Sequence, residues 1–288
     1  MNPPLAGPAF RAAISLIAAL GVLAPGAAVA EELGPAAPEL RVNLPADVSA
    51  TLTAAGLWIG SELWKDELAP AECRWCEGNR VDSSVRDALV WKSSGHTAVI
   101  VSNVGAYALA PVAALGLAAL SAAHEGRARS NLLVDVLVIA EAAALAGDLG
   151  QLIKFSVGRQ RPYAHAGLPN TDPSLGPRDA NLSFYSAHTN ITFALAAATG
   201  TVGRLRGYRW APIAFIAGGA LAVTTGYLRI AADQHYLSDV LAGAVAGTAL
   251  GIAVPAFHRP RPRPHGGAPA PTVSLVPTGR GLSLAARW

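Results

Sequence analysis

Five long apolar segments set the strongest limit on what this chain can fold into. They cover Val99 to Ala123, Leu132 to Ile153, Ile191 to Val202, Ala211 to Leu228, and Leu237 to Phe257. Most approach the roughly 20 residues that a helix needs to cross a bilayer, and residues 186–190 extend the third. Only 14% of the residues are charged and 52% are hydrophobic, whereas soluble domains carry about 25% charged residues. The segments therefore predict an all-α fold, a bundle of transmembrane helices.

The second apolar segment is unusual, because it carries Asp135, Glu141 and Asp148. An acid that faces lipid is costly, so these side chains are expected to face other helices or water. Their alternative interpretation, an amphipathic helix in water, keeps a soluble all-helical protein open. The net charge is only +3 and the basic residues are dispersed, so nucleic acid is not an expected partner.

The first 30 residues have the pattern of a secretory signal peptide. Arg11 precedes an apolar run, and Ala28-Val29-Ala30 matches an A-x-A cleavage site. The alternative is an uncleaved anchor helix. Residues 31–97 are then expected outside the cytoplasm, as a Pro- and Ala-rich linker followed by an amphipathic helix. That helix, 48–64, is expected to lie along the membrane interface without crossing.

The exported segment contains both cysteines of the chain, Cys73 and Cys76. Outside the cytoplasm a disulfide is the favoured interpretation. Paired free thiols come next, and a metal site last, because two cysteines supply only half of the four ligands that structural zinc needs.

The C-terminal tail, 258–288, follows the apolar domain 98–257. Its first part alternates Arg and Pro and predicts an extended linker. Residues 272–276 and 282–286 flank a turn that contains Pro and Gly, which predicts a small β-hairpin.

Polar residues are scarce in the second half of the chain, yet they gather at three ends of apolar segments. The first cluster ends the second segment with Lys154, Arg159 and Arg161, directly before Pro162. Lys154 and Arg161 can both reach an anion held at the membrane face. Taken alone, such a cluster is more typical of a positive flank that extends toward lipid headgroups.

The second cluster opens the third apolar segment. Ser186 is a natural N-cap, and the free N–H groups that begin with Ala187 form a seat for an anion at the positive end of the helix dipole. His188 lies in the same first turn and can protonate a leaving alkoxide. A capping serine beside a histidine is, by itself, more often structural.

The third cluster connects the fourth and fifth apolar segments. His235 and Asp239 are four residues apart, so they share one face if the fifth helix begins there. The carboxylate can then hold one imidazole nitrogen and leave the other as a nucleophile. Arg229 adds a planar donor fork for phosphate oxygens. The same His-Asp spacing alone is also common in helix caps and ion pairs.

Together the clusters resemble the three-part signature of the type 2 phosphatidic acid phosphatase and vanadium haloperoxidase superfamily, in its membrane lipid phosphatase branch. The family's Lys, six residues, Arg-Pro is matched by 154–162, and its Pro-Ser-Gly-His by 185–188. Its Ser-Arg, five residues, His, three residues, Asp is matched by 228–239. The sequence departs from this pattern only where Tyr185, Ala187 and Leu228 replace Pro, Gly and Ser.

A second match to the middle motif, Ser93-Ser94-Gly95-His96, stands before the first motif and therefore in the wrong order. His96 is expected to be an interface residue at a helix start.

The resemblance implies a phosphatase that needs no metal and no cofactor and acts on a lipid phosphate or an isoprenyl diphosphate. It implies a phosphate clamp made of Lys154, Arg161, Ser186, Ala187 and Arg229. His235, oriented by Asp239, would attack phosphorus and form a phosphohistidine, and His188 would protonate the leaving oxygen. The loop 163–182 is expected to influence substrate choice.

Three alternatives remain beside this function. They are a soluble periplasmic acid phosphatase of the same superfamily, a vanadate-dependent haloperoxidase, and a non-enzymatic membrane transporter or scaffold with a defunct pocket. The five apolar segments speak against the haloperoxidase, since soluble relatives of that kind do not need them, whereas the soluble acid phosphatase stays open.

The arginines of the loops predict the orientation. If the chain after Ala30 is outside and the helix 48–64 does not cross, the loops 124–130 and 203–210 and the tail from 258 all lie inside, and all are rich in Arg. The three clusters then share the outer face. The expectation is a multi-pass protein of the cell's inner membrane with its site facing the periplasm.

Overall fold

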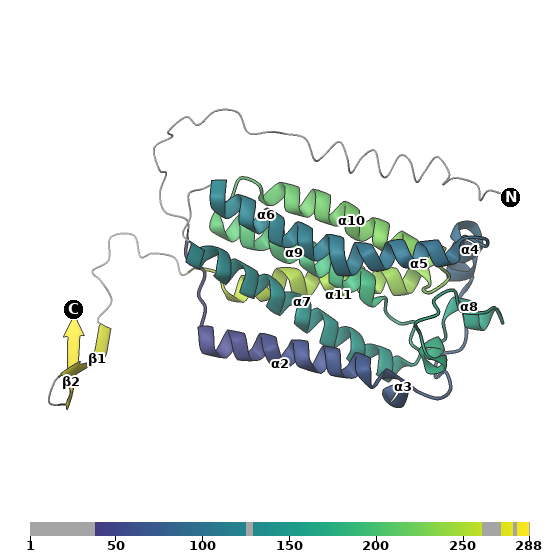
Figure 1. Cartoon of the computed structure of the whole chain (residues 1–288), viewed down its shortest axis with the longest axis horizontal. Helices are drawn as coiled ribbons and strands as arrows, with labels where there is room; N and C mark the ends of the chain where they lie inside the picture. Colours follow the sequence, from purple (N-terminus) through teal and green to yellow (C-terminus); the bar gives the residue numbers. More distant parts are fainter. Residues whose placement is uncertain (1–37, 125–128, 261–271, 279–280, 288) are drawn as a thin grey trace. The chain divides into compact units, whose positions relative to one another are not determined.

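The computed structural model describes residues 38–124, 129–260, 272–278 and 281–287 (Figure 1). The expected signal peptide or anchor, 1–30, lies outside the described residues, as does most of the Arg/Pro linker. Most of the described chain before residue 260 is helical, so the all-α prediction is confirmed.

Long helices run side by side along one axis (Figure 1). They are α2 (Leu44–Leu63), α5 (Gly95–Val104), η1 (Gly105–Leu109), α6 (Ala110–His124), α7 (Arg129–Val157), α9 (Ala187–Arg206), α10 (Ala211–Ala231) and α11 (Leu237–Phe257). The π-helical turn η1 joins α5 and α6 into one continuous rod. Short elements gather at one end of the bundle, namely α3 (Lys65–Leu68), α4 (Arg80–Leu89), α8 (Pro162–His165) and η2 (Pro177–Asn181). This end is called the site end below.

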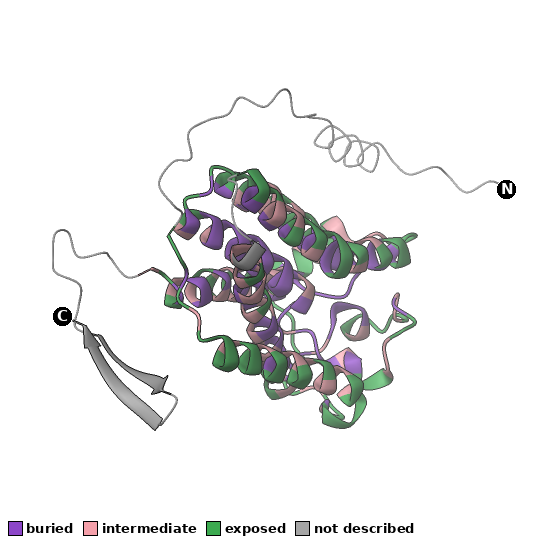
Figure 2. Cartoon of the chain, turned by 60° about the vertical axis from the view of Figure 1, so that its left-hand side comes forward, coloured by how far each residue is buried: buried purple, intermediate pink, exposed green. Residues whose placement is uncertain are grey.

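Helix α9 lies in the middle of the bundle and is buried over most of its length (Figure 2). Its closest neighbour is α11, which presents Gly243, Gly247 and Gly251, one per turn, to the α9 backbone. A Cβ at Gly247 would collide with the carbonyl oxygen of Asn190, so only glycine allows this approach. The tight packing fixes the start of α9 beside the start of α11, where the Ser186 N–H donates to the Asp239 carbonyl over 3.1 Å.

Three helical stretches are long and apolar enough to cross a membrane, by length and composition: Gly95–His124, Ala211–Ala231 and Leu237–Phe257. Their outward faces carry large exposed apolar side chains, such as Val112, Ile216 and Val245. In water these faces would be unfavourable, and in a bilayer they contact lipid. The helices support an integral membrane protein.

Two of the acids in α7 face other helices, as expected. Asp135 accepts hydrogen bonds from Arg206 Nε over 2.7 Å and from the Tyr208 hydroxyl over 2.9 Å. Glu141 Oε2 lies 3.1 Å from Nε2 of His258. These pairs join α7 to the segments after α9 and α11, at the end of the bundle opposite the site.

Helix α2, which covers most of the helix expected at 48–64, packs along the bundle. It runs beside α7 from one end of the bundle to the other (Figure 1). Before it, the Arg41 N–H donates to the His258 carbonyl at the far end, and after it Lys65 reaches Asp179 at the site end. The approach is close because Gly147 of α7 leaves room for the Trp58 ring.

The outer side of α2 is apolar as well, with Leu52, Leu57 and Ile59 exposed. The helix is therefore not amphipathic in the sense expected.

After the linker, β1 (Thr272–Thr278) and β2 (Gly281–Arg287) pair antiparallel, with Leu275 opposite Leu284. Each strand has seven residues and is two residues longer than the segment expected for it.

Candidate active site

The three polar clusters meet around one cavity of about 170 Å³ at the site end. Each cluster belongs to a helix terminus: the end of α7, the start of α9, and the turn between α10 and α11. The cavity is lined by Glu62, Lys65, Asn103, Tyr107, Lys154, Arg161, Asp172, Ser174, Leu175, Ala187, His188, Arg229 and His235. Six of these residues were expected from the sequence to bind phosphate or to carry the chemistry. Ser186 and Asp239 lie behind the cavity wall.

Cations dominate the wall of the cavity. Lys154, Arg161 and Arg229 are each at most 5% exposed, and Lys65 joins them from the start of α3. Arg229 Nη1 approaches Ser102 Oγ at 3.3 Å, whereas its Nε has no hydrogen-bond partner among the described residues. Buried donors without partners are costly, and a bound anion would satisfy them.

Asp179, from the loop 163–182, holds Arg161 in place. Its Oδ2 lies 2.6 Å from Arg161 Nη2, its backbone carbonyl accepts from Arg161 Nε over 2.9 Å, and Lys65 Nζ is 3.3 Å away. Burial alone would raise the pKa of the Asp179 carboxyl, but the charges of Arg161, Lys65 and Lys154 hold that pKa below its ordinary value. Asp179 therefore stays ionised and fixes the guanidinium.

His235 presents one ring nitrogen to the clamp. Arg161 Nη1 lies 3.2 Å from His235 Nε2. Because a guanidinium can only donate, Nε2 must be the unprotonated acceptor and the ring proton must lie on Nδ1. Burial, and then the charges of Arg161, Arg229 and Lys154, lower the pKa of His235 well below 6.5. The imidazole is thus neutral, with its free lone pair on the cavity side.

Asp239 does not make the direct hydrogen bond to His235 that the spacing predicted. Its Oδ2 lies 3.7 Å from His235 Nδ1, whereas the backbone of Ser183 makes a hydrogen bond to the His235 ring. The carboxylate instead accepts from Arg159 Nη1 over 2.6 Å, from Ser183 Oγ over 2.6 Å and from the Tyr236 N–H over 2.8 Å. Asp239 therefore caps the start of α11.

His188 is positioned by a residue that the sequence did not single out. Asn103 Oδ1 lies 2.7 Å from His188 Nε2, and the ring of Tyr107 packs 4.8 Å from the imidazole. Asn103 also comes within 3.5 Å of Arg229 Nη1. The signal in the sequence was the polar pair Ser102-Asn103 inside an otherwise apolar segment.

Ser186 is the N-cap of α9, where its Oγ accepts from the Thr189 N–H over 3.4 Å and from the Thr189 hydroxyl over 2.9 Å. Ala187, the first residue of the helix, lines the cavity. The helix N-terminus thus faces the same space as the cations. His96, by contrast, lies at the exposed start of α5, where Nδ1 is 3.0 Å from the Thr171 carbonyl, and it does not line the cavity.

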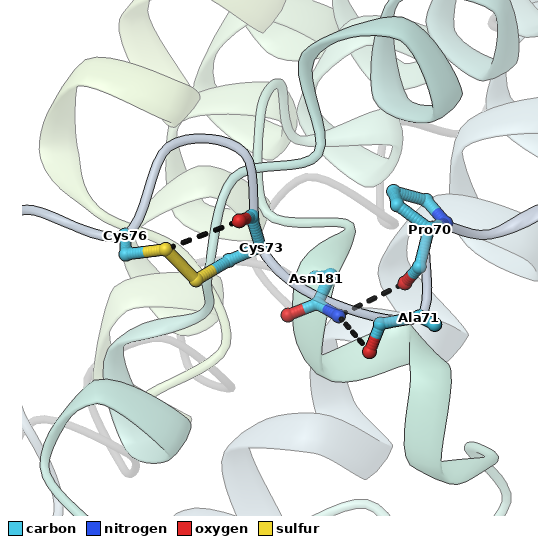
Figure 3. Close-up of a disulfide and its surroundings, with 5 residues drawn as sticks. All are labelled: Pro70, Ala71, Cys73, Cys76 and Asn181. Atoms are coloured by element: carbon cyan, nitrogen blue, oxygen red, sulfur yellow. Dashed lines mark hydrogen bonds between the residues drawn. A yellow bond between two sulfur atoms is a disulfide. The ribbon is translucent and has the colours of Figure 1, made fainter.

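The structure joins Cys73 and Cys76 in a disulfide (Figure 3). The loop before it is held to the site by Asn181, whose Nδ2 donates to the carbonyls of Pro70 and Ala71 over 2.9 and 3.2 Å. The disulfide therefore lies at the same end of the bundle as the cavity.

Comparisons with known proteins agree with the motifs. Residues 135–263 match the family model of the PAP2 superfamily, which confirms the resemblance. Among solved structures, the chain is similar to a transmembrane PAP2 type phosphatidylglycerolphosphate phosphatase from Bacillus subtilis, with 18% sequence identity and a TM-score of 0.47. That likeness covers 73% of this chain and 94% of the other. A search of curated proteins finds no match.

Proposed function

We propose that this chain, whose residues 135–263 match the PAP2 superfamily model, hydrolyses a lipid phosphate or diphosphate in the membrane through a phosphohistidine at His235. One observation carries the proposal: four cations and the N-terminus of α9 surround a cavity into which two histidines project. A phosphoryl group supplies the negative charge that this wall lacks.

The clamp and the nucleophile act together in the first step. Phosphate oxygens accept from Arg161, Arg229 and Lys154 and from the free N–H groups of α9, which withdraws charge from phosphorus. The lone pair of His235 Nε2 then forms the N–P bond while the bond from phosphorus to the leaving oxygen breaks. The proton on Nδ1 stays in place, and the nearby charge of Asp239 stabilises the cationic ring.

His188 acts as the general acid in the first step and as the general base in the second. It gives a proton to the leaving oxygen, so that an alcohol departs rather than an alkoxide. In the second step it takes that proton back from a water molecule, whose oxygen attacks phosphorus as the N–P bond breaks. Inorganic phosphate is released, and both histidines return to their starting protonation. Asn103 keeps the imidazole turned toward the cavity throughout.

An apolar groove beside the cavity supports a lipid as the substrate. The groove has a volume of about 370 Å³ and lies between α2, η1, α6, α7 and α9. Its walls are almost wholly apolar: Thr51, Ala55, Trp58, Ala106, Tyr107, Pro111, Ala114, Leu115, Val136, Ile139, Ala140, Ala143, Ala144, Ile191 and Leu195. Tyr107 lines both the groove and the cavity. A phosphate in the cavity and a hydrocarbon chain in the groove would suit one amphiphilic molecule.

A panel assay tests the function and the substrate class together. Purified protein is tested for phosphate release from phosphatidate, phosphatidylglycerol phosphate, an isoprenyl diphosphate, a phosphorylated glycolipid and a water-soluble phosphate monoester. Ala140→Trp, which fills the groove, should slow the long-chain substrates and spare the soluble one. Leu152→Trp, at an exposed position of the same helix, serves as the control. Equal slowing of soluble and long-chain substrates would remove the groove from the proposal, and no release from any substrate would remove the enzyme.

We also propose that the site end faces the periplasm and that α2 begins in the cytoplasm. Arg204 and Arg209 are exposed at the opposite end of the bundle, where Arg41 and Arg259 also lie, and the positive-inside tendency places that end inside. The disulfide at the site end favours the same orientation, since disulfides persist outside the cytoplasm. A cleaved signal peptide would leave the start of α2 outside, so this orientation favours the uncleaved alternative for 1–30.

Single cysteines test the orientation in a background without Cys73 and Cys76. Ala166→Cys, exposed in the loop after α8, should react with a membrane-impermeant thiol reagent on intact cells. Arg209→Cys, exposed between α9 and α10, should react only after the cells are opened. The reverse pattern would place the site inside.

A further inference from the structure

The disulfide loop is built onto the first phosphate-binding motif. The N–H groups of Arg74 and Trp75 donate to the Gly158 carbonyl over 2.9 and 3.3 Å, and the Gln160 N–H donates to the Trp75 carbonyl over 3.0 Å. These bonds make a short parallel bridge between Trp75 and Arg159. Gly158 has a φ of +60°, and a Cβ there would press on Pro70 and Arg74, so glycine lets the loop dock. The loop and the end of α7 therefore form one local unit.

The bridge places the Trp75 ring over the Arg159 guanidinium. The Cζ atom of Arg159 lies 4.0 Å from the centre of the Trp75 ring and 4.3 Å from that of Tyr236 on its other side. Cation–π contacts of this kind fix the plane of a guanidinium. Trp75 is 38% exposed and forms the outer cover, whereas Arg159 is fully buried. Removing the ring would open Arg159 to water and leave its plane free to tilt.

Arg159 in turn holds Asp239. Its Nη1 donates to Asp239 Oδ1 over 2.6 Å, and its Nη2 donates to Asp82 Oδ2 over 2.8 Å. Asp82 is itself fixed by the N–H of Ser238 over 2.9 Å and by the Ser238 hydroxyl over 2.6 Å. The other oxygen of Asp239 lies 3.7 Å from His235 Nδ1. A tilt of the guanidinium would therefore move the one carboxylate beside the nucleophile.

We propose that Trp75, held in its loop by the Cys73–Cys76 disulfide, is a positioning residue for His235 and acts through Arg159 and Asp239, so that reducing the disulfide slows the enzyme. The proposal rests on the function proposed above. Reduction by a dithiol transfers two electrons and two protons to the cysteine pair, and the dithiol becomes the cyclic disulfide. The four-residue turn then loses its closure, and the docking of Trp75 depends on the backbone bonds to 158–160, on the Arg74 side chain, which donates to the Ser156 carbonyl over 2.9 Å, and on the Phe184 ring 5.5 Å away.

The first experiment compares oxidised and reduced wild-type protein in detergent. Thiol labelling verifies each redox state, and kcat and KM are measured on phosphatidate. We expect kcat to fall roughly 10-fold on reduction, less than the 10²-fold cost of misplacing a reacting group by about 1 Å, with little change in KM. The Cys73→Ser/Cys76→Ser variant should match the reduced enzyme and should not respond to the dithiol. An unchanged kcat in protein with verified free thiols would overturn the proposal.

The second experiment separates positioning from general stability. Trp75→Ala should lower kcat and move the acid limb of the profile of kcat against pH, because Asp239 then sits differently beside His235. Trp75→Phe, which keeps an aromatic face, should restore most of both. Trp210→Ala, equally exposed at 37% but at the opposite end of the bundle, should change neither. Loss of thermal stability in Trp75→Ala with an unmoved pH profile would mean that Trp75 is merely structural.

The outcome also separates this proposal from the proposed function. If oxidised wild-type protein releases no phosphate from any substrate, both fall. If it releases phosphate, but kcat is the same in the oxidised and reduced protein and in Trp75→Ala, only the positioning role of Trp75 is refuted.

Discussion

The two ends of the helical bundle differ in how completely their buried positive charge is paired, since the site end holds buried pairs such as Arg159 with Asp239 but also leaves Arg229 without an acidic partner among the described residues. At the end opposite the site, the buried charges are paired, as in Arg206 with Asp135 and His258 with Glu141. At the site end, cations outnumber acids along the cavity, and Arg229 Nε has no partner among the described residues. Paired charges hold helices together, whereas unpaired cations are kept ready for a ligand. The same residue type therefore has a different purpose at each end.

The largest expected effect is that of removing the nucleophile. His235→Ala should reduce phosphate release below about 1 per cent of wild type, because no other group can form the N–P bond. The fold should persist, since the alanine leaves space in a cavity rather than in the apolar core. Substantial turnover in a correctly folded His235→Ala protein would assign the nucleophile elsewhere. Mass spectrometry of acid-sensitive phosphate on quenched wild-type enzyme gives a direct check.

Removing one residue of the phosphate clamp should lower activity less than removing His235 does, but the loss should still be large. Arg161→Ala and Arg229→Ala should each lower kcat/KM roughly 10²-fold, as the loss of one preorganised donor does in other enzymes. The stability of Arg229→Ala should hold or rise, because it relieves crowding among buried cations, whereas Arg161→Ala should also lose stability, because it removes the partner of the buried Asp179. Lys92→Ala, an exposed cation outside the clusters, is the control. Near-normal turnover in both arginine variants would refute the phosphate clamp.

Arg206→Ala should lower stability but leave activity nearly unchanged. It leaves Asp135 buried in the bundle without its cation, and breaking a buried pair costs about 3 kcal/mol or more. Thermal unfolding in detergent should therefore begin at a clearly lower temperature, while kcat per folded molecule stays nearly unchanged. If Arg206→Ala impairs turnover as strongly as Arg229→Ala does, the contrast between the two ends is wrong.

Most residues of the candidate site could be predicted from the sequence, because each motif lies at the end of an apolar helix. Lys154, His188 and His235 are far apart in the chain, but antiparallel helices bring alternate ends together, and the motif spacings fix which side chains share a face. Side-chain contacts within the site were harder to predict. The spacing paired Asp239 with His235, yet Arg159 and Ser183 take its oxygens, because a guanidinium donates more strongly than a ring N–H at 3.7 Å.

Features that depend on packing between distant helices were not predictable from one segment at a time. Lys65 and Asn103 reach the cavity only because α2 and α5 pack at particular rotations. The packing of α2 along α7 was not predictable from the residues of α2 alone. Gly147 of α7 is what admits Trp58, and that fit appears only when both helices are present.

The smallest expected effect is a shift in pH dependence, and it tests the charge at the site end directly. Burial and then the cations, with Arg161 first among them, lower the pKa of His235 well below 6.5. The neutral ring is the nucleophile, so activity should persist as the pH falls through 6.5 and should decline only at the lowered pKa. Arg161→Ala removes a positive charge that disfavours the protonated ring, so the pKa of His235 rises and the acid limb of kcat/KM moves to higher pH. Measuring both enzymes on one substrate cancels the titration of the substrate itself, and Lys92→Ala should follow the wild-type curve. Coincident acid limbs for wild type and Arg161→Ala would show that the clamp does not tune the nucleophile.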